Sequence, residues 1–266
     1  MKIAFVLEYD GSQYQGWQRQ SGVPTVQACL EDALSKVADQ RVRVHCAGRT
    51  DSGVHAYGQV VHVETHAKRE RRSWVFGANA NLPRDIRVVW AREVEDDFHA
   101  RFSAIRRTYR YLIFNHSTRG AILRNHAAWE CRALDHGRMQ EGASHLVGTH
   151  DFSAFRAHSC QAQNPVRTLC QLSVTRLGSF ISIVVEANAF LHHMVRNIAG
   201  VLMAIGMGKA PPVWALEVLL SRDRTLGGVT APAEGLYLMQ VRYPPQYNIP
   251  ETGISTADPL SIVNPP

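Results

Sequence analysis

The ten residues CAGRTDSGVH, at positions 46–55, hold a guanidinium and a carboxylate two residues apart between two glycines. In an extended chain such side chains project from one face, so Arg49 and Asp51 can share a pocket. Gly48 and Gly53 would admit a ligand or another stretch of main chain. A guanidinium beside a carboxylate lowers its pKa and keeps it ionised. Such a carboxylate can act as a nucleophile or a base, but it is a poor general acid.

The same residues also fit a purely structural explanation. In an Asx-turn the Asp51 side chain would cap its own loop, a role that aspartate and glycine often fill. Residue spacing alone favours this turn. The choice between a turn and a reactive group therefore depends on the rest of the chain.

Metal and nucleotide sites are not expected from the remaining motifs. His192 and His193 are adjacent, so on a helix their side chains diverge and share one ion poorly. The His62–Glu64 stretch reads H-x-E, but the chain has no C-x-x-C to complete a deaminase zinc site. The sequence contains no HExxH motif and no complete P-loop motif, and no G-x-G-x-x-G follows a strand. We expect neither a metal nor an organic cofactor.

Basic and aromatic residues are interleaved, which suits RNA with splayed nucleotides. The formal net charge is +6. A solvated charged face explains any single cluster, whereas three clusters together favour a nucleic-acid partner. The clusters are Arg19 beside Trp17; Lys68, Arg69, Arg71 and Arg72; and Arg101, Arg106, Arg107 and Arg110 around Tyr109 and Tyr111. Of these, Arg19, Arg107 and Arg110 are candidate contacts to the substrate.

The composition is that of an ordinary globular protein, with 45% hydrophobic and 20% charged residues. Five cysteines without regular spacing indicate reduced thiols rather than a disulfide framework. The apolar runs are too short for a signal-peptide core or a membrane span. We expect a soluble cytoplasmic protein with no membrane partner.

Two stretches of mixed strands and helices must position these residues. The first combines strands at 3–7, 41–46, 58–64 and around 84–90 with a helix that starts after Thr25. The second combines strands at 108–114, 169–176 and 180–190 with helices capped by Asp135, spanning 192–206, and starting at Pro212. These patterns predict an α+β fold with an N-terminal half at 1–100, a C-terminal half at 101–245 and an extended proline-rich tail at 246–266.

The segment CAGRTDSGVHAYGQVVH resembles the signature of the tRNA pseudouridine synthase A family. The resemblance continues, in the family's order, through YDGSQYQGWQRQ, FHARFSAIRRTYRYLIFN, NAFLHHMVRNIAG and AEGLYL, over about residues 3–245. It implies isomerisation of uridine to pseudouridine at positions 38 to 40 of the tRNA anticodon stem-loop, without metal or cofactor. It also implies two related α/β halves whose antiparallel sheets join into one continuous sheet, and a homodimer.

The resemblance assigns roles to individual residues. Asp51 falls on the catalytic aspartate and Tyr109 on the active-site tyrosine that contacts the target base. Arg49 matches an arginine that handles the flipped nucleotide. Leu236 matches an apolar pocket residue, and Arg196 is similar to the basic residue that pairs with the aspartate in related synthases. Addition of the carboxylate at C1′ and removal of the C2′ proton both remain open as routes.

Two other functions fit parts of the sequence. A non-catalytic tRNA-binding chaperone would keep the basic clusters, but it has no need for Arg49, Asp51 and Tyr109 together. A hydrolase acting on nucleosides would normally need two carboxylates, one of them with a raised pKa. Only Asp51 has a suitable setting. Inert free uridine would favour an enzyme that draws binding energy from a large RNA.

Overall fold

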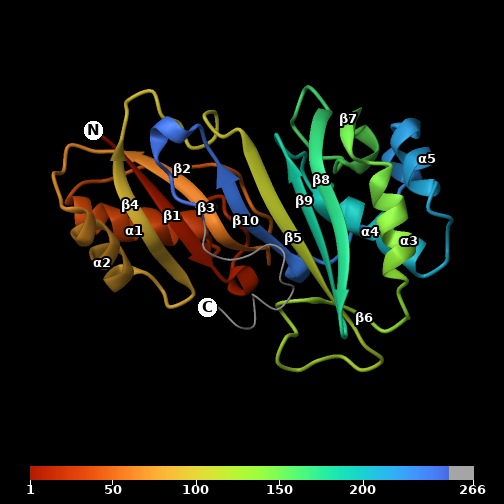
Figure 1. The fold of residues 1–266 in the computed structure, drawn as a ribbon. Coiled ribbons are helices and arrows are strands. Elements are labelled where there is room, and N and C mark those ends of the chain that lie inside the picture. The colour runs from red at the N-terminus through yellow and green to blue at the C-terminus, as the bar shows by residue number, and fades with distance from the viewer. Residues whose placement is uncertain (252–266) are drawn as a thin grey trace. The chain divides into compact units, whose positions relative to one another are not determined.

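A computed structural model describes residues 1–251 and divides into two compact units (Figure 1). Among the described residues, the first unit holds 1–105 and 237–251, and the second holds Arg106–Leu236. Residues 237–242, which lie within the predicted C-terminal half, thus belong to the first unit, because they form a strand that pairs with a strand there. Most of the predicted tail, residues 252–266, lies outside the described residues.

The sheet of the first unit is built on two long antiparallel pairings. Strand β1 (Lys2–Tyr9) pairs with β3 (His55–Glu64) on one side and with β4 (Ile86–Val94) on the other. The two-residue β2 (His45–Cys46) is antiparallel to β3, and β10 (Leu236–Arg242) runs parallel to it over Tyr237 and Leu238. The β2–β3 connection carries the Asp51 motif.

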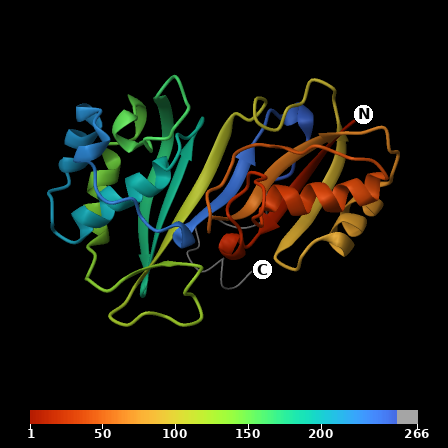
Figure 2. The ribbon, with the colours of Figure 1, turned by 180° about the vertical axis from the view of Figure 1, so that it is seen from behind.

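Two helices cover one face of this sheet (Figure 2). Helix α1 (Val26–Ala38) buries Leu30 and Leu34, and α2 (Arg71–Asn81) packs Trp74 edge-on against Phe5 of β1. Thr25 is the N-cap residue of α1, as predicted, but its side chain makes no capping hydrogen bond.

The second unit repeats this layered plan with its own strands. Its sheet runs β5 (Arg106–Asn115), β9 (Phe180–Ala187), β8 (Val166–Leu177) and β7 (Gly148–Asp151), and every pairing along that path is antiparallel. The short β6 (Ala128–Glu130) adds a parallel pairing to β5. The predicted mixture of strands and helices is therefore present in both units.

Helices cover one face of the second sheet as well (Figures 1 and 2). They are α3 (His136–Ser144), α4 (Met194–Gly206) and α5 (Trp214–Ser221). Asp135 caps α3 as predicted, because its carboxylate accepts a hydrogen bond from the Arg138 N–H at 3.1 Å. Gly142 lets α3 approach α4, since a Cβ there would stand 2.8 Å from the Ile205 side chain.

The predicted mixed α/β fold is confirmed in each unit, although one predicted strand is largely absent. Only the end of the predicted strand at 41–46 forms β2. Val42 and Val44 are buried, but their N–H groups donate to the Ser35 hydroxyl and the Glu31 carboxylate of α1. Side chains of α1 thus accept the hydrogen bonds that a neighbouring strand would otherwise accept. The joining of the two sheets stays a prediction.

Candidate functional site

The loop between β2 and β3 is held from inside by Thr50. This threonine is 7% exposed, and its hydroxyl lies 2.8 Å from the hydroxyl of Tyr9, at the end of β1. Its carbonyl accepts the Trp17 N–H at 2.9 Å. The Gln59 side chain of β3 donates to the Gly48 carbonyl at 2.6 Å. Buried hydrogen bonds therefore fix the loop on both sides of Arg49.

A second loop, residues 10–17, packs its main chain directly on the first. The Tyr14 carbonyl accepts the Gly53 N–H at 3.3 Å and the Ser52 hydroxyl at 3.2 Å. Gly16 has φ +86°, and a Cβ there would stand 2.8 Å from the Thr50 carbonyl oxygen. A Cβ at Gly11 would overlap the Val54 carbonyl. The glycines of YDGSQYQGW are thus required by the approach of the Asp51 loop.

Asp51 and Arg49 flank the buried Thr50 and lie nearer the surface. Asp51 is half-buried and Arg49 is exposed. The turn after Asp51 is closed by its carbonyl, which accepts the Val54 N–H at 3.1 Å. A main-chain bond therefore helps to close this turn.

The Arg49 guanidinium does not form the direct pair with Asp51 that the spacing predicts. Across residues 1–251 it makes no hydrogen bond or ion pair. It lies near the Cys46 thiol, whose pKa burial raises to about 12, while the charges of Arg49 and Arg101 act in the opposite direction. Arg49 is thus exposed and available to an anionic ligand.

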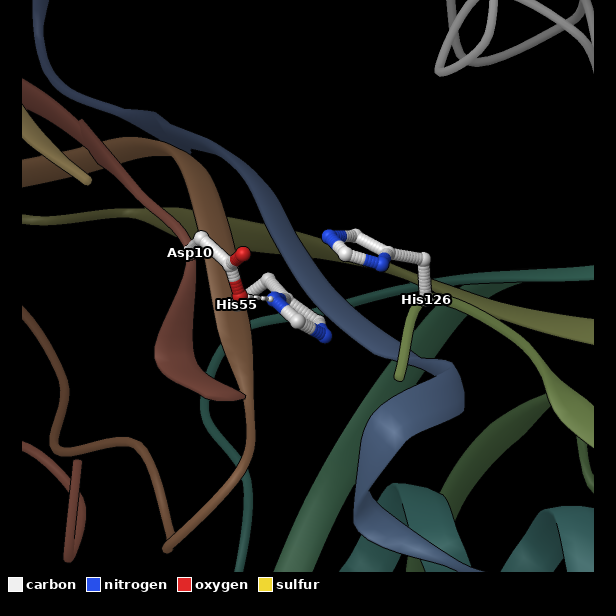
Figure 3. A group of neighbouring side chains, drawn as sticks. All are labelled: Asp10, His55 and His126. Carbon is white, nitrogen blue, oxygen red and sulfur yellow. Dashed lines mark ion pairs between the residues drawn. The ribbon is translucent and has the colours of Figure 1, made fainter. Parts of the chain in front are cut away.

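A histidine and an aspartate join the bases of the two loops. His55 follows directly after the Asp51 loop, and its Nδ1 lies 3.1 Å from an Asp10 carboxylate oxygen (Figure 3). The Gly11 N–H lies 3.1 Å from the same nitrogen. One nitrogen either accepts from Gly11 or, when protonated, donates to Asp10. Either bond ties residue 55 to the 10–17 loop, and the His55 ring also stacks on Tyr237 at 4.6 Å.

In the second unit, Tyr109 projects from the regular strand β5. It is 8% exposed, and its ring makes an edge-to-face contact with the Phe190 ring, at a centroid distance of 5.0 Å and an interplanar angle of 81°. Tyr111, two residues on, is fully buried, and its hydroxyl donates to the Pro232 carbonyl at 2.9 Å. Burial raises the pKa of Tyr111 well above its ordinary value. Tyr111 is therefore a structural residue.

The predicted substrate arginines are less open than the sequence indicates. Arg110 is fully buried, and the nearly buried Arg107 donates to the Asn188 carbonyl at 2.9 Å. Arg19 forms ion pairs of 3.1 Å with Glu31 and 3.4 Å with Asp32 of α1. These ion pairs would have to open before Arg19 could bind a phosphate.

Arg196 and Leu236 both lie where chain segments converge in the second unit. Arg196 is in the first turn of α4, and its Nε donates to the Ala231 carbonyl at 2.8 Å. Leu236 is buried at the start of β10. The preceding Gly235 is required, because a Cβ there would stand 2.7 Å from the Leu112 carbonyl oxygen.

The basic cluster at 68–72 contacts the protein's own aromatic rings and main chain. Arg71 lies over Trp90 at 5.9 Å, and Arg72 lies over Phe76 at 5.3 Å. Arg69 donates to the Val37 carbonyl at 3.2 Å. The cluster therefore supports local packing of α2 as well as the positive charge of the unit.

Comparison with known proteins identifies relatives over almost the whole chain. A family described as tRNA pseudouridine synthase matches residues 5–103 and 143–244. The tRNA pseudouridine synthase A of Alcanivorax borkumensis is 55% identical over 94% of both chains. The protein of that name from Nitrosococcus oceani is 57% identical over 94% of this chain and 96% of its own. That from Coxiella burnetii is 55% identical over 94% of this chain and 95% of its own. These matches confirm the resemblance found in the motifs.

Proposed function

The chain belongs to the tRNA pseudouridine synthase family and is an isomerase of uridine in tRNA, and on this premise we propose that it acts at positions 38 to 40 of the anticodon stem-loop with Asp51 as its catalytic carboxylate. The setting of Asp51 carries this proposal. Main-chain bonds close the Asp51 turn, and buried Thr50 fixes the loop. The carboxylate is therefore carried on a loop whose position is fixed by main-chain and buried hydrogen bonds.

The reaction conserves atoms and needs only proton transfers besides its carbon–nitrogen and carbon–carbon bond changes. The N1–C1′ bond breaks, the uracil turns, and a new bond joins C5 to C1′. The hydrogen at C5 leaves as a proton, and N1 gains one. Asp51 either adds to C1′ as a nucleophile or removes the C2′ proton, and both routes use an ionised carboxylate.

Arg49 and Tyr109 have separate proposed roles. A uridine in a stem must leave the base stack, at a cost of a few kcal/mol. The exposed Arg49 guanidinium would occupy the space that the flipped base leaves. The Tyr109 hydroxyl, or a water that it orients, would accept the C5 proton, and its ring would stack on the uracil during rotation.

Mapping the modified positions tests this proposal. An unmodified tRNA transcript with uridines at 38, 39 and 40 would be incubated with wild type or Asp51→Asn, and pseudouridine located by carbodiimide labelling and primer extension. We expect stops at these positions with wild type and none with the variant, which should still bind tRNA. Stops elsewhere would refute the assigned positions, and stops with Asp51→Asn would refute its role.

The family resemblance also supports a cytoplasmic homodimer, and both properties are part of the proposal. No helix among the described residues is long and apolar enough to cross a membrane. Light scattering of the purified chain, at several concentrations, would give the mass expected for two chains if the proposal is correct.

A further inference from the structure

A group of largely exposed basic and aromatic side chains lies beside the Asp51 loop in the first unit. It consists of the exposed Arg43, His45, Arg49, Arg101 and Phe102 and the half-buried His99, and we refer to it as the Phe102 surface. None of its members is acidic. Phe102 is 74% exposed, and the Arg101 guanidinium lies over its ring at 5.5 Å.

Ring contacts connect Phe102 to the strand that leads into the Asp51 loop. The Phe102 ring lies 4.4 Å from that of His99, and His99 lies 5.6 Å from His45 of β2. Both histidine rings also contact buried His62, at 4.7 and 5.0 Å. A continuous set of rings therefore runs from the sheet to the exposed face of Phe102.

Hydrogen bonds hold the turn that carries Phe102 in one shape. His99 Nδ1 lies 3.1 Å from the Arg101 N–H and 3.4 Å from the Phe102 N–H, and His62 Nδ1 accepts the Ala100 N–H at 3.2 Å. The Ser103 hydroxyl accepts the His99 N–H at 2.9 Å. Phe102 is thus a positioned aromatic side chain on an ordered turn.

Two exposed arginines, Arg43 and Arg49, flank β2, whose His45 ring contacts His99. Arg43 and His45 are exposed on one face, since residues two apart in an extended chain share a face. Across residues 1–251, neither Arg43 nor Arg49 makes a hydrogen bond or ion pair. Arg49 and Arg101 both lie close enough to Cys46 to favour its thiolate, which places both near the end of β2. This charge favours an anionic partner.

We propose that Phe102, backed by the His99 ring, stacks on an unpaired base of the tRNA substrate while Arg43 and Arg49 bind phosphates beside that base. Every base offers a flat face to an aromatic ring, and single-stranded nucleotides expose theirs. The inference deepens the proposed function and rests on it, because it assigns the RNA contacts that accompany the Asp51 loop.

Binding and turnover of Phe102 variants test the surface. The probe is an unmodified tRNA transcript, with Kd from filter binding, and KM and kcat from tritium release at uridine C5. We expect Phe102→Ala to raise Kd about tenfold, Phe102→Leu to raise it nearly as much, and Phe102→Trp to restore it, because stacking contributes about 1–3 kcal/mol per base. In the turnover assay, Phe102→Ala should raise KM more than it lowers kcat. Unchanged Kd for Phe102→Ala would overturn the proposal.

Phe76→Ala is the matched control. Phe76 is 63% exposed and also carries an arginine over its ring, but it lies on α2 and has no ring contact with β2. We expect wild-type Kd and turnover from this variant. A loss of tRNA affinity equal to that of Phe102→Ala would overturn the proposal, since any exposed phenylalanine with an arginine over its ring would then contribute to binding. If Phe102→Ala instead binds tRNA normally and only loses dimer mass, the surface is a subunit contact.

Arg43→Ala tests the phosphate contact separately. The slope of log Kd against log salt should fall by roughly 0.7 to 0.9 for one lost phosphate contact. An unchanged slope would remove Arg43 from the surface. Tritium release by wild type separates the two proposals: if wild type releases none while Phe102→Ala still weakens tRNA binding, the function fails and the surface stands.

Discussion

The Asp51 loop and the Tyr109 strand hold their side chains in different ways. Asp51 lies on an irregular loop whose shape depends on main-chain hydrogen bonds and on the missing side chains of Gly11 and Gly16. Tyr109 projects from a regular antiparallel strand, where it pairs with Val185 and packs against Phe190. Small changes of backbone should therefore damage the first region, and changes of side-chain packing the second.

The largest expected effect is at Gly16. Gly16→Ala adds a Cβ 2.8 Å from the Thr50 carbonyl oxygen, at φ +86°. The loop must shift, and a displacement of about 1 Å can cost roughly 100-fold in rate. We expect kcat to fall by about that factor with the fold retained by circular dichroism.

Gly22→Ala is the control for backbone strain at Gly16. Gly22 has φ +77°, but a Cβ there would meet no atom within 4 Å. This variant should keep its kcat. An equal loss in both variants would show that strain, rather than contact with the Asp51 loop, is responsible.

Acid should weaken the first unit through His62. Burial lowers the pKa of His62 from 6.5 to about 3, and the neighbouring positive charges of His99, His45 and Lys2 make smaller contributions in the same direction. Between these values the unfolded chain binds a proton that the folded chain does not, so stability is present above pH 6.5 and is lost as pH falls. The free energy of unfolding should drop by about 1.4 kcal/mol per pH unit in that range.

Urea unfolding at pH 7, 6, 5 and 4 measures this dependence. His62→Gln should flatten the slope, whereas exposed His136→Gln should leave it unchanged. If His62→Gln loses stability with pH as steeply as wild type, another group is responsible.

Removing one hydroxyl from inside the Asp51 loop should have a smaller effect. Thr50→Val keeps the shape of the side chain but loses the 2.8 Å bond to Tyr9. Loss of a buried hydrogen bond costs about 1–3 kcal/mol. Because this bond holds the loop that carries Asp51, we expect kcat to fall roughly tenfold. Thr149→Val, at an exposed hydroxyl pair with Thr168, should leave kcat unchanged. Equal kcat for Thr50→Val and wild type would remove Thr50 from the support of Asp51.

The smallest effect is expected beside Tyr109. Phe190→Leu keeps apolar volume but loses the edge-to-face contact, which is worth about 0.5–1.5 kcal/mol. The rate of C5 proton loss should fall by a few-fold, because β5 still positions the tyrosine. A loss as large as that of Gly16→Ala would show that Tyr109 depends on its neighbour as strongly as Asp51 depends on its loop.

Sequence patterns predict the long, regular helices and strands of this molecule better than the segments whose main chain is hydrogen-bonded to side chains of other elements. The apolar, β-branched run of β9 and the apolar face of α4 are strong sequence signals, and both elements are present. Helix α2 was missed because it buries only Trp74 and Ala78 and contains glycine and asparagine, which are poor helix formers. The predicted strand at 41–46 is mostly replaced by bonds to α1, which no local pattern reveals.

The candidate site shows the same division. The motif located Asp51, and its glycines indicated a close approach of main chain. Composition did not reveal that Arg110 is buried or that Arg19 is already paired, because both depend on tertiary neighbours. Nor did it reveal Tyr9, Thr50 and Gln59 as the internal support of the loop. An isolated polar residue on a strand gives no sign of the partner that it will meet.

Tritium release from uridine C5 tests the role of Asp51 most directly. A tRNA transcript tritiated at that carbon would be incubated with wild type, Asp51→Asn and Gly22→Ala under conditions in which all three bind it. Our account predicts release to water by wild type and Gly22→Ala, and none above background with Asp51→Asn. Release by Asp51→Asn at the wild-type rate would contradict the central claim that this carboxylate carries the chemistry.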